Sequence, residues 1–353
     1  MKNAKRLTLL LVVAGFALIG SKSQAQGCVA AHSNQRVIDG LAGVDGGDSA
    51  SSYWLHNLTV DIGYRVFNSN KYFKGSTEIA RPTAVENHQN IFDIGIEYRL
   101  SKRWSLIADL PVYNGTRNQI YAPVGIYQVS GLGDMTIGAQ SWIFRPPTEN
   151  GGNVAVSGSL KIPTGIYNAT GQGLLKGQEV NATADQSMQP GDGAWGFNVA
   201  TMGYKSLWRH ASAYGQGSYL FNPQDTNGVA TFRTQPGQTV MSVTDQYLYR
   251  AGVAQGIPGI PKVRGLSLSI GIRGEGVPVR DLLGSSNGFR RPGSIISVDP
   301  GLMFNFKHDT FSVNGPWAIY RDRPPSVPEI QNNATGDAFF ADYTVIASVS
   351  HHF

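Results

Sequence analysis

The stretch that decides the fold is residues 92–100, which reads FDIGIEYRL. Its even-numbered positions are apolar, whereas its odd-numbered positions are charged or glycine. Successive side chains of a β-strand point to opposite faces, so this period of two predicts a strand with one apolar and one polar face. Residues 58–66 (LTVDIGYRV) and 266–273 (LSLSIGIR) repeat the pattern. Because these segments lie far apart in the chain, the pattern favours an all-β architecture.

Working outward from these segments, the connections between predicted strands alternate in length. Long polar connections follow the odd-numbered strands, as at 114–131 and 164–193, and short turns such as 101–103 follow the even-numbered ones. Transmembrane barrels of the outer membrane have short periplasmic turns and long extracellular loops. The sequence therefore predicts an outer-membrane β-barrel of about 12 antiparallel, up-and-down strands. The predicted strands cover 54–67, 89–100, 104–113, 132–144, 153–163, 194–205, 211–221, 241–257, 265–276, 294–306, 310–320 and 338–353.

The first 25 residues carry the three parts of a secretory signal peptide. Basic residues open it, residues 7–19 are apolar, and small residues at Ser23 and Ala25 provide a cleavage site. The apolar part is too short to span a bilayer. Removing 1–25 takes away four of the 29 basic residues and no acidic one, which leaves 25 basic and 24 acidic side chains. The net charge of +5 therefore belongs mostly to the signal, and it does not indicate a nucleic-acid partner.

The rest of the chain divides into an N-terminal extension, 26–51, and the predicted barrel, 52–353. Two places remain open for the extension: it plugs the lumen, or it lies in the periplasm. Cys28 is the one cysteine, so an intrachain disulfide is excluded. Ala25 and Gln26 match the motif for lipidation of a following cysteine poorly, which favours a free thiol.

The C-terminal segment combines alternation with a terminal aromatic residue, Phe353. It resembles the signal that the bacterial barrel-assembly machinery recognises, and we expect that machinery as a partner. Tyr98, Trp104 and Phe306 flank the predicted short turns, as expected for the aromatic girdle that contacts outer-membrane lipid. The predicted location is the outer membrane of a Gram-negative bacterium.

The polar faces of the predicted strands carry charges of both signs, which the period of two directs into the lumen. For any one of these residues, pairing that holds the wall together is favoured over contact with a solute. Pro111 falls within a predicted strand, where it removes a ladder hydrogen bond; we hypothesise a kink that opens the wall sideways. The lumen-facing candidates are Asp61, Arg65, Asp93, Glu97, Arg99, Asp109, Asp134, Lys161, Arg273, Glu275 and Asp299.

Motifs for catalysis are missing from the sequence. It contains no His-Glu-x-x-His, no Gly-x-Ser-x-Gly and no phosphate-binding loop that ends in Gly-Lys. A lipid-hydrolysing barrel would need a serine and a histidine together on the lipid-facing wall. His56 and His351 are the outward candidates, and neither belongs to a recognisable constellation. We therefore expect a protein that is not an enzyme, with no catalytic residue, no metal and no cofactor.

Three short segments resemble a known family: GLGDMTIG at 131–138, LKIPTG at 160–165, and YRLSKRWSL at 98–106. They are similar to the outer-membrane transporters of the phenol meta-cleavage pathway, a family similar in turn to the long-chain fatty-acid channels. The resemblance runs over most of 52–353 and implies a barrel that passes small, often hydrophobic molecules; no binding residue carries over. The expected function is thus a channel for passive passage of small solutes, hydrophobic or aromatic ones included. The alternatives are a non-transporting barrel that anchors partners and, less favoured, a lipid hydrolase.

Overall fold

The chain is seen in a computed structural model that describes residues 57–80, 85–120, 122–144, 151–258 and 265–353. The expected signal peptide, the N-terminal extension and His56 lie outside these residues. In the described part, no helix has the length and apolar character needed to cross a membrane. The described fold consists almost entirely of β-strands.

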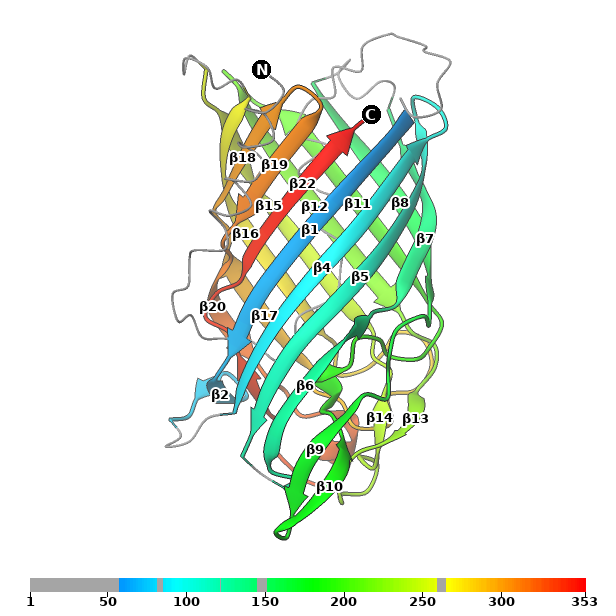
Figure 1. The fold of residues 1–353 in the computed structure, drawn as a ribbon. Coiled ribbons are helices and arrows are strands. Elements are labelled where there is room, and N and C mark those ends of the chain that lie inside the picture. The colour runs from blue at the N-terminus through cyan, green and yellow to red at the C-terminus, as the bar shows by residue number, and fades with distance from the viewer. Residues whose placement is uncertain (1–56, 81–84, 121, 145–150, 259–264) are drawn as a thin grey trace, which may run out of the picture.

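The described strands form a closed antiparallel barrel of twelve strands, which confirms the predicted fold class. The barrel closes because the first strand pairs with the last along Thr59–Val66 and Val345–His352. Figure 1 shows the strands strongly tilted against the barrel axis. The barrel strands are β1 (Leu58–Ser69), β4 (Glu86–Arg99), β5 (Trp104–Gln119), β6 (Gly125–Leu132) with β7 (Met135–Trp142), β8 (Gly152–Ile162), β11 (Gly196–Ser206), β12 (Ala211–Phe221), β15 (Gln246–Gly256), β16 (Leu266–Val277), β17 (Gly293–Val298) with β18 (Gly301–Phe306), β19 (Asp309–Asn314) with β20 (Trp317–Asp322), and β22 (Val345–His352).

The alternation in the sequence becomes an apolar outer wall and a polar inner wall. Ile62, Ile96 and Ile270 are exposed on the outside at 53%, 42% and 61% of their surface. Arg65 and Arg273, which have the opposite parity, are buried inside. Large apolar side chains facing outward around a closed barrel form the surface that a bilayer covers.

The two ends of the barrel differ as the loop lengths predict. Tight turns join strands at the end where β22 finishes, for example between Leu100 and Trp104, whose backbone N and O lie 2.8 Å apart. The opposite end carries the hairpin of β9 and β10 and other small elements (Figure 1). These are β2 (Lys71–Lys74), β3 (Thr77–Glu78), β9 (Thr170–Leu175), β10 (Gln178–Thr183), η3 (Gln186–Met188), β13 (Thr226–Ala230), β14 (Val240–Ser242), α2 (Val327–Gln331) and β21 (Asp337–Phe340).

Three predicted boundaries are wrong at this long-loop end. One is the start of the strand predicted at 241–257, because β15 begins at Gln246 and β14 before it pairs with β13. The stretch 114–131 is not a loop, because β5 continues to Gln119 and β6 starts at Gly125, and the two pair along their length. The last strand begins at Val345, because β21 before it pairs with β2. Beyond the bilayer the outer face of a strand no longer has to be apolar. Where these strands continue past the lipid, apolar and polar residues therefore no longer alternate clearly.

Candidate functional site in the barrel lumen

The barrel interior holds a cavity of about 220 Å³. The inner faces of β5, β7, β8, β11, β12 and β15 line it, together with residues 186–192 from the connection between β8 and β11. Roughly half of the lining side chains are uncharged amides and hydroxyls, and most of the rest are apolar. The cavity therefore lies on one side of the lumen, and its wall is mainly neutral.

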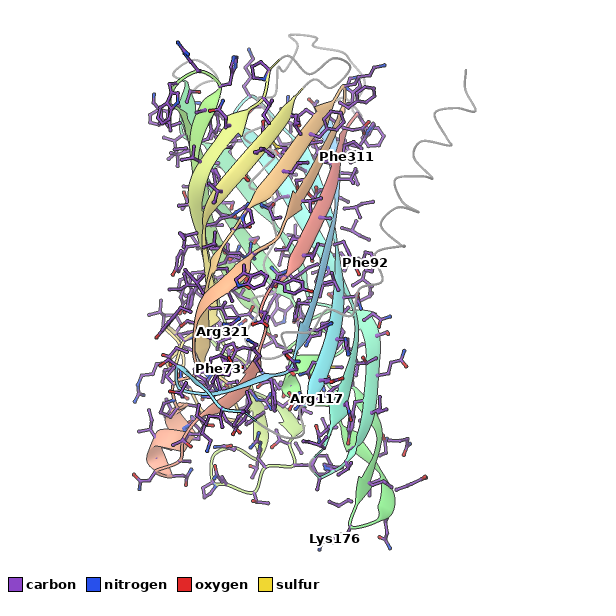
Figure 2. All side chains as sticks on the ribbon, turned by 90° about the vertical axis from the view of Figure 1, so that its left-hand side faces the viewer. Phe73, Phe92, Arg117, Lys176, Phe311 and Arg321 are labelled. Atoms are coloured by element: carbon purple, nitrogen blue, oxygen red, sulfur yellow. The ribbon has the colours of Figure 1, made fainter. Side chains whose placement is uncertain are left out.

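The segment 163–195, which we call the inner loop, covers this side of the lumen from the long-loop end. It contains the β9–β10 hairpin, with Lys176 at its tip in Figure 2, and the short helix η3. Ala182, Ala184 and Met188 of the loop are fully buried against aromatic and aliphatic side chains of the inner wall. The Tyr113 hydroxyl points at the Met188 sulfur at 3.3 Å. Apolar burial thus holds the loop inside the barrel mouth.

The base of the inner loop meets the wall where β7 begins. Asp134 accepts hydrogen bonds from the backbone N–H groups of Gly165 (2.9 Å) and Asp192 (2.8 Å). Lys161, buried at the end of β8, forms an ion pair with Asp192 and lies 4.0 Å from Asp134. A Cβ atom at Gly165 would meet backbone atoms of Gly133, Asp134 and Gly191 within 2.9 Å. The glycine-rich segments 131–138 and 160–165 therefore come together here and let three stretches of backbone approach closely.

The part of the inner loop around η3 is held by a second charged group. Both terminal nitrogens of Arg291 donate to the carboxylate of Asp185, at 2.5 and 2.6 Å. Arg117, buried near the long-loop end of the barrel (Figure 2), lies 3.5 Å from the same carboxylate and donates to Asn87 at 2.6 Å. Burial alone would raise the pKa of Asp185, but these two guanidinium groups hold it well below its usual range. The carboxylate stays charged and fixes η3 in place.

Charged side chains fill the other side of the lumen. Arg65 of β1 reaches across to Glu275 of β16 (3.9 Å), which also pairs with Arg273 at 2.9 Å. Arg250 of β15 pairs with Asp299, and their Nε and Oδ2 atoms lie 2.5 Å apart. All five side chains are buried. These buried ion pairs fill this side of the lumen with charged side chains.

The remaining predicted lumen residues are spread along the barrel. Asp61 accepts a hydrogen bond from Ser350 at 2.5 Å, and Asp93 interacts electrostatically with Arg65. Glu97 and Arg99 lie near His352 at the short-turn end. Asp109 lines the cavity, as do Asp134 and Lys161. The predicted residues thus belong to several groups and do not form one site.

Sequence reasoning missed Arg117, Asp185, Asp192, Arg250 and Arg291. Arg117 and Arg250 sit at inward positions of β5 and β15, so extending the alternation would have found them. The other three lie outside the strands, where no period exists to follow. Asp185 and Arg291 are 106 residues apart in the chain, and no local pattern signals their pairing.

Pro111 interrupts the ladder on one side only. Toward β4 the register is continuous through the Asp93–Pro111 pair. On its other side, β5 pairs with β7 as far as Asp109 and with β6 from Val112. The register shifts by one residue between the two ladders, and the Gly133 N–H donates to the Pro111 carbonyl at 2.8 Å across the shift. The inner loop occupies the break, where the Ile166 N–H donates to the Leu132 carbonyl at 3.0 Å. Pro163 follows the end of β8, and Pro300 separates β17 from β18.

A closed barrel with an apolar outer wall, short turns at one end and long loops at the other is built for the outer membrane of a Gram-negative bacterium. The chain has an outer-membrane barrel fold. His351, one of the two outward histidines considered for catalysis, contacts a carboxylate: its Nδ1 atom lies 2.6 Å from Oδ1 of Asp309.

Three solved structures are similar to this chain to different degrees. An outer membrane channel from Pseudomonas putida F1 is 15% identical over 88% of this chain and 100% of its own, with a TM-score of 0.56. The translocator domain of the autotransporter NalP from Neisseria meningitidis is 14% identical over 88% and 91%, with a TM-score of 0.44. The Pseudomonas putida toluene transporter TodX is 8% identical over 84% and 90%, with a TM-score of 0.43. No protein-family model matches the chain, and no curated protein matches it.

Proposed function

We propose that the chain is an outer-membrane channel for the passive passage of small molecules. The observation that carries the proposal is the cavity on the neutral side of the lumen, inside a closed barrel whose other side is filled by ion pairs. A barrel that served only as an anchor would have no need to keep this space. Similarity of fold to the Pseudomonas putida F1 channel supports the same function.

A solute enters from the long-loop end, where the inner loop covers the cavity. Two charged groups hold that loop, one at Asp134 and Lys161 and one at Asp185. Between them lies the apolar contact around Met188. Small displacements of the loop at these contacts would admit a solute, so the loop sets the rate of passage.

The finer part of the proposal concerns hydrophobic and aromatic molecules, the cargo implied by the resemblance to the phenol meta-cleavage transporters. The register shift beside Pro111 supports a lateral exit, because Pro111 lines the cavity and the wall there is joined through the Gly133–Pro111 hydrogen bond between two ladders of different register. An apolar solute leaving there would pass directly into lipid. Solutes that need water would continue along the lumen.

Two partners complete the proposal. The end of β22, where the Phe353 N–H donates to the Leu58 carbonyl at 3.1 Å, is the element that the barrel-assembly machinery would recognise. Outer-membrane lipid covers the apolar wall, with the exposed rings of Trp104, Phe306 and Phe353 near the short turns.

Reconstitution into liposomes tests the proposal. We expect vesicles that contain the protein to swell in iso-osmotic sugars and amino acids faster than empty vesicles. Vesicles that contain the Pro111→Ala variant should take up an apolar aromatic solute more slowly than vesicles that contain the wild type. Sugar should enter both at the same rate. Swelling no faster than that of empty vesicles for every solute would contradict the channel function.

A further inference from the structure

The cavity wall is chemically uniform in one respect: its polar groups are mainly neutral. Gln140 and Thr136 come from β7, Ser157 and Ser159 from β8, and Gln216 and Ser218 from β12. Amide and hydroxyl groups both donate and accept hydrogen bonds. They can replace the water around an uncharged polar solute without bringing a charge near it.

The two cationic side chains among the described lining residues, Lys161 and Arg291, both form ion pairs with carboxylates. Arg291 uses both terminal nitrogens on Asp185, and Lys161 pairs with Asp192 beside Asp134. Asp109 adds a further buried carboxylate to the wall. Among the described lining residues, carboxylates therefore outnumber cations, and an anion entering the cavity would have to break an existing ion pair to find a counter-charge.

The size of the cavity sets the size of the solute. An apolar protein cavity of about 150 Å³ holds a benzene molecule. A volume of about 220 Å³ is about one and a half times as large, so the cavity accepts a solute whose volume exceeds that of benzene by up to about half. Apolar side chains, among them Met202, Leu220 and Val277, cover the rest of the wall, so one face of the solute can be apolar.

We infer that the cavity is a solute site that takes neutral, hydrogen-bonding molecules and excludes organic anions. This inference rests on the proposed channel function and names its substrate class. Aromatic acids and sugar acids of the right size would be rejected by charge, whereas their uncharged counterparts would pass.

Proteoliposomes of zwitterionic phosphatidylcholine test the selectivity, because that bilayer itself contributes no net charge. The efflux of radiolabelled glucose, glucosamine and glucuronate is measured at physiological ionic strength. We expect glucuronate to leave about tenfold more slowly than glucose, which corresponds to about 1.4 kcal/mol. Glucosamine should leave at a rate within a few-fold of that of glucose.

Two substitutions at one lining position separate charge from shape. Gln140→Lys puts a cation into the wall, and we expect it to raise the glucuronate-to-glucose ratio about tenfold. Gln140→Met has similar length without the charge and should leave the ratio as in the wild type, even if both rates fall. Heat-modifiable migration on a gel verifies that each variant has folded.

The outcomes distinguish the inference from the channel function itself. If no solute leaves wild-type vesicles, the channel function fails. If glucose and glucuronate leave equally fast, or if the two Gln140 variants give the same ratio, the channel stands and the selectivity for neutral solutes is overturned.

Discussion

The two sides of the barrel interior are built from strands with the same alternation, yet they hold different contents. On the side of β1 and β16, buried arginines and carboxylates bridge the lumen, as in the Arg65–Glu275 pair. On the side of β7, β8 and β12, small hydroxyls and amides leave a cavity. The comparison shows that alternation decides which residues face inward, and that their size and charge decide whether the lumen there is filled or open.

The largest effect is expected on the filled side. Asp299→Asn leaves the Arg250 guanidinium buried without its counter-ion, and breaking a buried pair in this way costs about 3–5 kcal/mol of the free energy of unfolding. Urea unfolding in lipid vesicles, followed by tryptophan fluorescence, measures the loss. Ser159→Ala on the open side is the control and should cost less than about 1 kcal/mol.

A double variant sharpens this test. Arg250→Met combined with Asp299→Leu replaces both ions by apolar groups and should recover most of the lost stability. Equal losses for Asp299→Asn and Ser159→Ala would show that the two sides do not differ energetically.

The next effect concerns the contact that holds η3 of the inner loop. Asp185→Asn weakens the contacts to Arg117 and Arg291 and should lower the free energy of unfolding by about 2–3 kcal/mol. Because this contact holds the loop over the open side, single-channel conductance in planar bilayers should rise. Lys176→Ala at the hairpin tip is the matched control. Conductance that is unchanged in Asp185→Asn would contradict the role of the loop as a cover.

A smaller effect is expected at the base of the loop. Gly165→Ala forces a Cβ against backbone atoms that cannot rotate away, which should cost about 1–3 kcal/mol. Gly158→Ala, seven residues earlier, meets no atom within 4 Å and serves as the control. Thermal unfolding compares the two variants, and similar midpoints would refute the close approach at Gly165.

The smallest effect is expected from pH. A carboxyl whose pKa is lowered in the folded state stabilises the fold above its unfolded value, about 3.9, and that stability is lost as pH falls through the folded pKa. The pKa of Asp185 is held well below its usual range, so its contact with the arginines persists throughout the range from pH 8 to about 4. The difference in conductance between the wild type and Asp185→Asn should therefore stay constant over that range. A rise in conductance between pH 6 and pH 4 that Asp185→Asn abolishes would contradict this assignment.

Much of the wall could be predicted from the sequence, because one rule governs it. Lipid outside and water inside impose a period of two, and that period gave the strands and directed residues such as Arg65 and Lys161 inward. The period of two ends where the outer face of a strand no longer contacts lipid. Residues 114–131 carry polar groups on both faces and therefore predict a loop, although β5 and β6 pair there.

The site itself was less predictable. The cavity depends on the inner loop, and the pairing of Asp185 with Arg291 joins segments that no periodicity relates. The two glycine-rich segments stood out in the sequence, but their meeting at Asp134 follows from how the loop returns to the wall, which local patterns do not encode.

The most direct test of the account asks which side of the lumen the solute path follows. In a Cys28→Ser background, Ser157→Cys places a thiol on the open side and Ser297→Cys places one among the charged residues beside Arg273. A water-soluble thiol reagent is added during single-channel recording in planar bilayers. The account predicts that the current through Ser157→Cys falls sharply while that through Ser297→Cys is unchanged. Block of Ser297→Cys with no effect on Ser157→Cys, or no channel current at all, would contradict it.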